Sequence, residues 1–151
     1  MKRDLALLLL RLSGIGLALV HGWAKIARFS TGEGGRFFAG VSEMGFPLPE
    51  AFAWAAAISE FAGGLLVALG LATRIAASFA AVTMFVAAFF RHRFPLQVLS
   101  WAGTLRLSEK TLDGWGSPEL ALVYLLVLSA LILLGAGRFS LDHLLFKKGR
   151  G

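Results

Sequence analysis

Glu60 is the residue of this sequence whose position says most about chemistry. It lies near the middle of an apolar segment that runs from Ala51 to Leu71. Placing a charged side chain in a bilayer costs about 2.5 to 3.5 kcal/mol, so such a group marks either a packed interior or a functional site. We therefore expect other groups of the membrane-embedded part of the chain to bind the Glu60 side chain.

The first apolar segment offers candidate partners for Glu60. One of its faces carries polar or small residues at helical steps of three and four: Arg11, Gly14, Ala18, His21 and Lys25. At about 1.5 Å per residue, Arg11 lies about 9 Å from the inner helix end and His21 about 9 Å from the outer end. Glu60 lies about 13 Å below the outer surface on the returning helix, between these two depths. We expect an Arg11–Glu60–His21 polar cluster in the interior, serving either catalysis or only charge neutralisation and helix register.

Membrane-spanning helices must position these groups. Hydrophobic residues make up 57% of the chain, and apolar runs lie at about 5–27, 51–71, 74–91 and 118–136. Each run approaches the roughly 20 residues that a helix needs to cross a bilayer. We predict an all-α integral membrane four-helix bundle that forms a single domain over residues 1–151. The stripe Gly14-x3-Ala18-x3-Gly22 predicts close packing against a neighbouring helix.

Charge and cysteine content limit the orientation and the partners. Lys147, Lys148 and Arg150 follow the last span directly, as in a cytoplasmic tail that meets anionic membrane lipid. With four spans, both termini are then cytoplasmic. The net charge of +6 is a topology signal rather than a nucleic-acid footprint, so we expect no nucleic-acid partner. The chain contains no cysteine, which excludes a thiolate nucleophile, a disulfide or a cysteine-ligated metal within it.

Several blocks of the sequence are similar to one known family. They are His21-Gly22-x-x-Lys25, Glu60-x-x-Gly63-Gly64, Thr73-Arg74, Glu119-Leu120-Ala121-Leu122-Val123-Tyr124 and Gly135-Ala136-Gly137-Arg138. In this order and spacing, over essentially the whole chain, they resemble the DoxX family of small bacterial membrane proteins. The resemblance implies a multi-pass, four-helix protein of the bacterial cytoplasmic (inner) membrane. It also implies a link to DoxD, the membrane subunit of thiosulfate:quinone oxidoreductase.

Our leading functional hypothesis is a subunit of a quinone-linked oxidoreductase, with a headgroup slot in the outer half of the bundle. We expect Glu60, His21 and Arg11 to be catalytic and Trp23, His92 and Tyr124 to bind the quinone; no metal site is predicted. Quinone reduction takes up two protons and two electrons, which suits a histidine near the surface and a buried glutamate. The electrons must come from a redox partner protein or a soluble donor, because the sequence has no flavin or metal motif.

Other functions stay open. The protein could be a non-catalytic scaffold that assembles partner proteins, or a carrier of a small anion or lipid-like molecule that uses Arg11 and Glu60. A haem held by His21 and His92 is the weakest alternative, since two histidines without a further motif specify little. The small-residue faces also allow a homo-oligomer.

Overall fold

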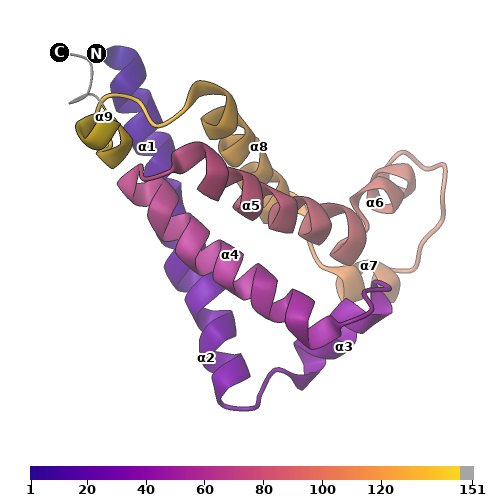
Figure 1. Cartoon of the computed structure of the whole chain (residues 1–151). Coiled ribbons are helices and arrows are strands. Elements are labelled where there is room, and N and C mark those ends of the chain that lie inside the picture. Colours follow the sequence, from indigo (N-terminus) through magenta and orange to yellow (C-terminus); the bar gives the residue numbers. More distant parts are fainter. Residues whose placement is uncertain (147–151) are drawn as a thin grey trace.

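The computed structural model describes residues 1–146, and every regular element in that range is a helix (Figure 1). In chain order the elements, with η for π-helix, are α1 (Lys2–Gly16), η1 (Leu17–Trp23), α2 (Ala24–Ser30), α3 (Gly35–Glu43), α4 (Pro49–Leu69), α5 (Thr73–Val86), η2 (Ala87–Arg91), α6 (Phe94–Trp101), α7 (Glu109–Trp115), α8 (Glu119–Leu134) and α9 (Leu141–Phe146). The all-α prediction is therefore confirmed for the described residues. The three basic residues of the predicted cytoplasmic tail, 147, 148 and 150, lie outside them.

Three continuous helices are long and apolar enough to cross a membrane: Lys2–Ser30, Pro49–Leu69 and Thr73–Arg91. A fourth span requires α7 and α8 together, and these two helices are bent by 41° at their junction. The first helix exceeds its predicted range of 5–27 at both ends. The charged residues near its ends do not stop the helix. It ends at Ser30, two residues before Gly32, whose φ of 80° is left-handed.

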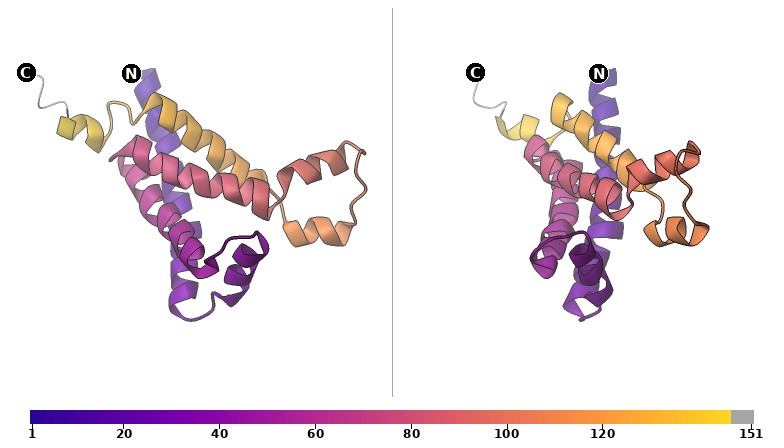
Figure 2. Two further views of the ribbon diagram at one scale, coloured as in Figure 1. Left: turned by 45° about the vertical axis from the view of Figure 1, so that its right-hand side comes forward. Right: turned by 90° about the vertical axis from the view of Figure 1, so that its right-hand side faces the viewer.

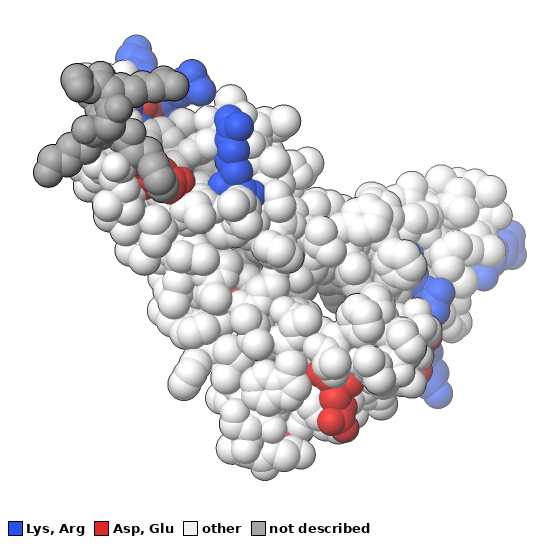
Figure 3. Space-filling view, in the orientation of Figure 1, with Lys and Arg blue, Asp and Glu red and all other residues white. Residues whose placement is uncertain are grey.

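The long helices form two pairs that diverge like the arms of a wedge (Figures 1 and 2). The first helix packs along α4, and α5 packs along α8. Helices α4 and α5 also pack against each other from their shared turn to Ser59 and Thr83, whose hydroxyls are 3.2 Å apart. That turn, the start of α1 and α9 lie at one end of the molecule; α3, α6 and α7 lie at the opposite end. Charged side chains gather toward these two ends on the face shown in Figure 3.

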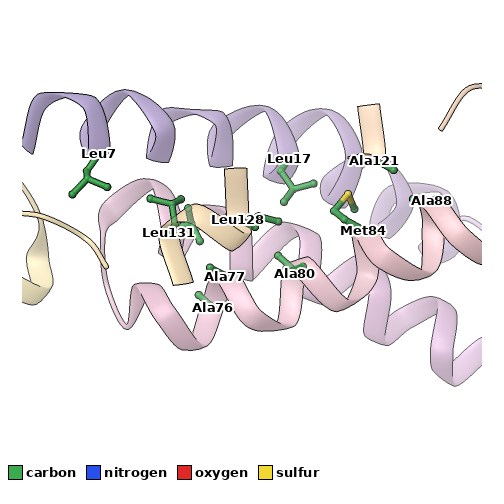
Figure 4. Packing of buried hydrophobic residues seen from close by; sticks show 12 residues of the cluster. Leu7, Leu17, Ala76, Ala77, Ala80, Met84, Ala88, Ala121, Leu128 and Leu131 are labelled. Atoms are coloured by element: carbon green, nitrogen blue, oxygen red, sulfur yellow. The ribbon is translucent and has the colours of Figure 1, made fainter. Parts of the chain in front are cut away.

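Two apolar clusters hold the wedge together. The larger one joins the α5–α8 arm to α1 and α4 through alanines and leucines, among them Leu17, Ala77, Ala80 and Leu128 (Figure 4). Alanines dominate the face that α5 contributes to this cluster, and these small side chains let the neighbouring helices approach α5 closely. The second cluster joins α2, α3 and α4 around Phe29 at the end opposite the termini.

The α4–α5 turn is fixed by groups from distant parts of the chain. Gly70 ends α4 with a left-handed φ of 70°, and its carbonyl accepts a hydrogen bond of 2.8 Å from the Asp142 amide. The Asp142 carboxylate in turn accepts bonds from the Ala72 and Thr73 amides, at 2.7 and 3.0 Å. A carboxylate on the first amides of α5 acts as its N-cap and favours its positive dipole end. These bonds dock α9 against the turn.

Candidate functional site

Glu60 carries its carboxylate inside the protein. Only 1% of its side chain is exposed, and Lys25 Nζ lies 2.5 and 2.6 Å from its two carboxylate oxygens. The lysine side chain is 23% exposed, and its ammonium also lies 5.2 Å from the centre of the Phe37 ring. The buried charge that the sequence indicated is therefore neutralised by one lysine that contacts both oxygens.

Lys25 faces Glu60 because the first helix and α4 approach each other almost to backbone contact. A Cβ added at Gly14 would lie 2.4 Å from the carbonyl oxygen of Gly64, and one at Gly22 would lie 2.3 Å from the Phe61 nitrogen. The close packing predicted from the small-residue stripe is thus observed. Since Gly22 lies opposite Phe61, the next turn of the first helix brings Lys25 beside Glu60.

The part of the first helix that leads to Lys25 is π-helical. The segment η1 covers Leu17–Trp23 and includes His21. A π-helical turn inside an α-helix changes which residues face a neighbour, and such turns are frequent at functional sites. Here the π-helical turns lie between the Gly14 contact and Lys25, so they affect the angle at which both His21 and Lys25 meet the other helices.

His21 and Tyr124 add two polar groups on the α8 side of the ion pair. Their rings are edge to face, with centroids 5.9 Å apart and an interplanar angle of 79°. A Cβ at Gly16 would lie 2.9 Å from the Tyr124 hydroxyl oxygen, which therefore rests against the first helix. We call Lys25, Glu60, His21 and Tyr124 the Glu60 cluster.

Arg11 is not a member of this cluster. Its guanidinium, in a side chain that is 1% exposed, donates to the Phe139 carbonyl in the loop before α9. Its Nη1 would lie 1.7 Å from a Cβ added at Gly70, so it sits directly on the α4–α5 turn. Glu60 lies ten residues before Gly70, about 15 Å away along α4. The expected Arg11–Glu60–His21 cluster is therefore wrong in geometry: Glu60 pairs with Lys25, and Arg11 binds the loop at the opposite end.

Trp23 and His92 lie in other surroundings. Trp23 is 54% exposed and packs with its ring 5.7 Å from that of Phe61. The His92 Nδ1 atom lies 2.6 Å from the Trp115 carbonyl oxygen, which ties η2 to the end of α7. Of the predicted site residues, the structure brings the His21 and Tyr124 rings together. Glu60 pairs with Lys25, Arg11 binds the loop before α9, and His92 contacts the end of α7.

Lys25 is the member of the cluster that sequence reasoning did not assign to a site. The signal was present, since Lys25 follows His21 by one helical turn on the same stripe. The depth estimate ended the first helix near residue 27, only two residues beyond Lys25. The helix continues to Ser30, and this places Lys25 within the packed region. Within residues 1–146, no group of three or more His, Asp or Glu side chains is arranged to hold a metal ion.

The chain is similar to a known protein family and to a protein of another bacterium. The family model for DoxX matches residues 6–93, which include Lys25 and Glu60 but not Tyr124. An uncharacterized protein of Haemophilus influenzae (strain Rd) is 33% identical over 146 residues, which cover 97% of this chain and 95% of that relative. No solved structure matches the chain.

Proposed function

The chain belongs to the DoxX family, and from this premise we propose that it is a multi-pass protein of the bacterial inner membrane that serves a quinone-linked redox system. The observation that carries the proposal is the buried Lys25–Glu60 pair with His21 and Tyr124 beside it. Ionisable groups inside a membrane span mark proton routes and ligand sites more often than simple packing.

The proposal includes a four-span topology with both termini in the cytoplasm. It treats α8, extended by α7, as the fourth span. An even number of spans puts the start of α1 and α9 on one side, and both lie at the same end of the wedge (Figure 1). Lys2, Arg3, Arg74 and Arg138 are exposed near that end, as expected for the cytoplasmic side of a membrane protein.

The donors and acceptors of the Glu60 cluster suit a quinone headgroup. A bound quinone supplies two-electron, two-proton chemistry. The Lys25 ammonium and the Tyr124 hydroxyl are hydrogen-bond donors for carbonyl oxygens, and the Glu60 carboxylate orients the lysine. His21, half-buried on the first helix, offers ring nitrogens that can donate or accept a hydrogen bond at a bound headgroup.

Arg11 and His92 stay outside this proposed headgroup site because their side chains contact backbone carbonyls elsewhere, at Phe139 and Trp115. The chain has no cysteine, and its described residues hold no metal-binding cluster. In this proposal the electrons therefore come from a reductant carried by a partner protein, and the chain supplies the membrane site and the protons.

One observation favours a different function, that of a non-catalytic scaffold. Lys25 contacts both Glu60 oxygens, so the pair is complete without any ligand. Buried ion pairs of this kind can serve only to fix helix register. A scaffold would hold partner proteins through its surface and would not require Tyr124 or His21.

The test is binding of a short-chain ubiquinone or menaquinone analogue to the purified protein in lipid nanodiscs. We expect saturable binding by the wild type and a loss of about tenfold in Tyr124→Phe, which removes one hydroxyl donor and little volume. His21→Ala should weaken binding as well, and Arg28→Met, an exposed cation one turn beyond Lys25, should not. Circular dichroism controls for folding. Absence of binding to folded wild type, with partner proteins still co-purifying with Glu60→Gln, would favour the scaffold.

A further inference from the structure

A hollow lies between the end of α3, the end of η2 and the start of α6, and none of its lining residues belongs to the Glu60 cluster. Its volume is about 290 Å³, at the small end of ligand sites, so it holds a headgroup-sized moiety rather than a whole lipid. It is lined by Glu43, Met44, Phe89, Phe90, Arg93, Pro95 and Leu96. We call it the α3–α6 pocket; on the face shown in Figure 3 the surface is hollowed between the two arms of the wedge.

The backbone around this pocket departs from regular helix at two places. Phe89 and Phe90 belong to the π-helical segment η2, which interrupts the end of the third span. Arg93, two residues after η2, has a left-handed φ of 50°, which is strained for a residue with a side chain. Such strain and π-helical turns concentrate at binding sites. Here both act on residues that line the same pocket.

The pocket combines an apolar interior with two opposite charges. Phe89, Phe90, Met44 and Leu96 provide aromatic and aliphatic surface, while Glu43 and Arg93 are exposed residues of its lining. Within residues 1–146, neither of these two charged side chains forms an ion pair. The Arg93 guanidinium is held 5.8 Å from the Trp115 ring centre. The pocket therefore offers one oriented cation and one carboxylate to a ligand.

The surroundings of the pocket have the character of a membrane–water boundary. Helix α6 begins at Phe94 and exposes Val98, Leu99 and Trp101, with Trp101 64% exposed. A short helix with exposed apolar and tryptophan side chains, next to a basic residue, is typical of an element that lies in the interface plane. A ligand that enters the α3–α6 pocket from this side meets both the bilayer and water.

We propose that the α3–α6 pocket binds the headgroup of a zwitterionic phospholipid of the phosphatidylethanolamine type. A guanidinium matches a phosphate group with paired hydrogen bonds. A carboxylate and the faces of phenylalanine rings match an ammonium group. Because the pocket carries one charge of each sign, it selects a lipid whose headgroup carries both over one that carries only a phosphate. The acyl chains extend from the apolar interior into the bilayer.

The experiment uses the full chain in nanodiscs made from equal amounts of phosphatidylethanolamine and phosphatidylglycerol. After gentle transfer to detergent, native mass spectrometry measures which lipid stays bound in a one-to-one complex. We expect phosphatidylethanolamine to be enriched about twofold to fivefold, the effect of one exposed charge contact. In Glu43→Gln the enrichment should disappear or turn toward phosphatidylglycerol, because the acceptor of the ammonium is lost and the phosphate ligand is retained.

Three further variants separate headgroup recognition from damage to the fold. Arg93→Lys should retain a bound lipid, whereas Arg93→Gln should lose both lipids. Met44→Trp fills the pocket and should abolish the complex although both charges remain. Glu33→Gln and Arg106→Gln, exposed charges that do not line the pocket, are the matched controls.

Three results would overturn the proposal. The first is a lipid preference that is the same in Glu43→Gln and the wild type. The second is a complex that survives in Met44→Trp, since the lipid would then be bound elsewhere. Displacement of the lipid by a quinone analogue in the wild type, with no headgroup preference, would instead assign the pocket to the quinone and would also overturn it.

Discussion

Replacing Lys25 with methionine should destabilise the protein by about 3 to 5 kcal/mol, the usual cost of leaving a buried charge without its partner. The cost falls on Glu60, which is 1% exposed and has no other basic side chain within 4 Å in the described part of the chain. Methionine keeps the length and the apolar stem of lysine, so little packing is lost. The change therefore isolates the ion pair.

The reverse change should cost less. In Glu60→Gln the unpartnered group is Lys25, whose side chain is already 23% exposed and can turn its ammonium toward water or lipid headgroups. We expect a loss of about 1 to 2 kcal/mol, close to that of a hydrogen bond to a charged group. The double variant Lys25→Met with Glu60→Gln should lie near the Glu60→Gln value, because no buried charge remains. The two single losses should thus be far from additive.

The measurement is equilibrium unfolding in mixed micelles with an increasing fraction of sodium dodecyl sulfate, followed by circular dichroism. Arg28→Met is the matched control, an exposed cation on the same helix that should change stability by about 0.5 kcal/mol or less. If Lys25→Met were no less stable than Arg28→Met, or less harmful than Glu60→Gln, the reasoning from burial would be refuted.

Two more predictions concern the close contact between the first helix and α4 and the cap at the start of α5. Gly14→Ala should destabilise the protein by about 1 to 3 kcal/mol, because its Cβ would lie 2.4 Å from a backbone oxygen of α4 and the helices must move apart. Gly16→Ala should destabilise it less, since its Cβ would meet only the movable Tyr124 hydroxyl. Both are read by the same unfolding titration, and an equal cost for the two would contradict the close contact. Asp142→Ala should cost about 1 to 2 kcal/mol through loss of the α5 cap, seen as faster amide hydrogen exchange at Ala72 and Thr73; unchanged exchange there would argue against capping.

Much of the helical framework could be predicted because an apolar run of span length has few alternatives in a membrane. Three of the four predicted ranges correspond to helices that meet the length and hydropathy expected of a span. The fourth run gave an α-helix of 16 residues, which reaches span length only with the bent α7. The short helices α3, α6 and α7 were not predicted as helices. Helices of seven to nine residues are not stable alone, so packing and caps decide them.

The burial of Glu60 could be predicted, but the identity of its partner could not. Burial follows from the composition of one segment, whereas pairing depends on how two helices slide against each other. That register is set by the contact of Gly22 with the backbone at Phe61. A depth estimate from assumed helix ends cannot resolve a shift of one or two turns, and this was enough to exchange Lys25 for Arg11. The stripe itself had placed both basic residues on the correct face.

The first helix is thus fixed at two points by two different cations. Arg11 fastens it to the loop before α9 and the α4–α5 turn, and Lys25 fastens it to α4 at Glu60. Between these points the contact is made by glycine and alanine, which give close approach but no directional bond. Of the two cations, Arg11 is 1% exposed and held on a rigid turn, whereas Lys25 is partly exposed at the end of a π-helical segment. Of these two cations, Lys25 is therefore the one that can exchange one hydrogen-bond acceptor for another without unfolding a helix. A headgroup site at Glu60 requires such an exchange.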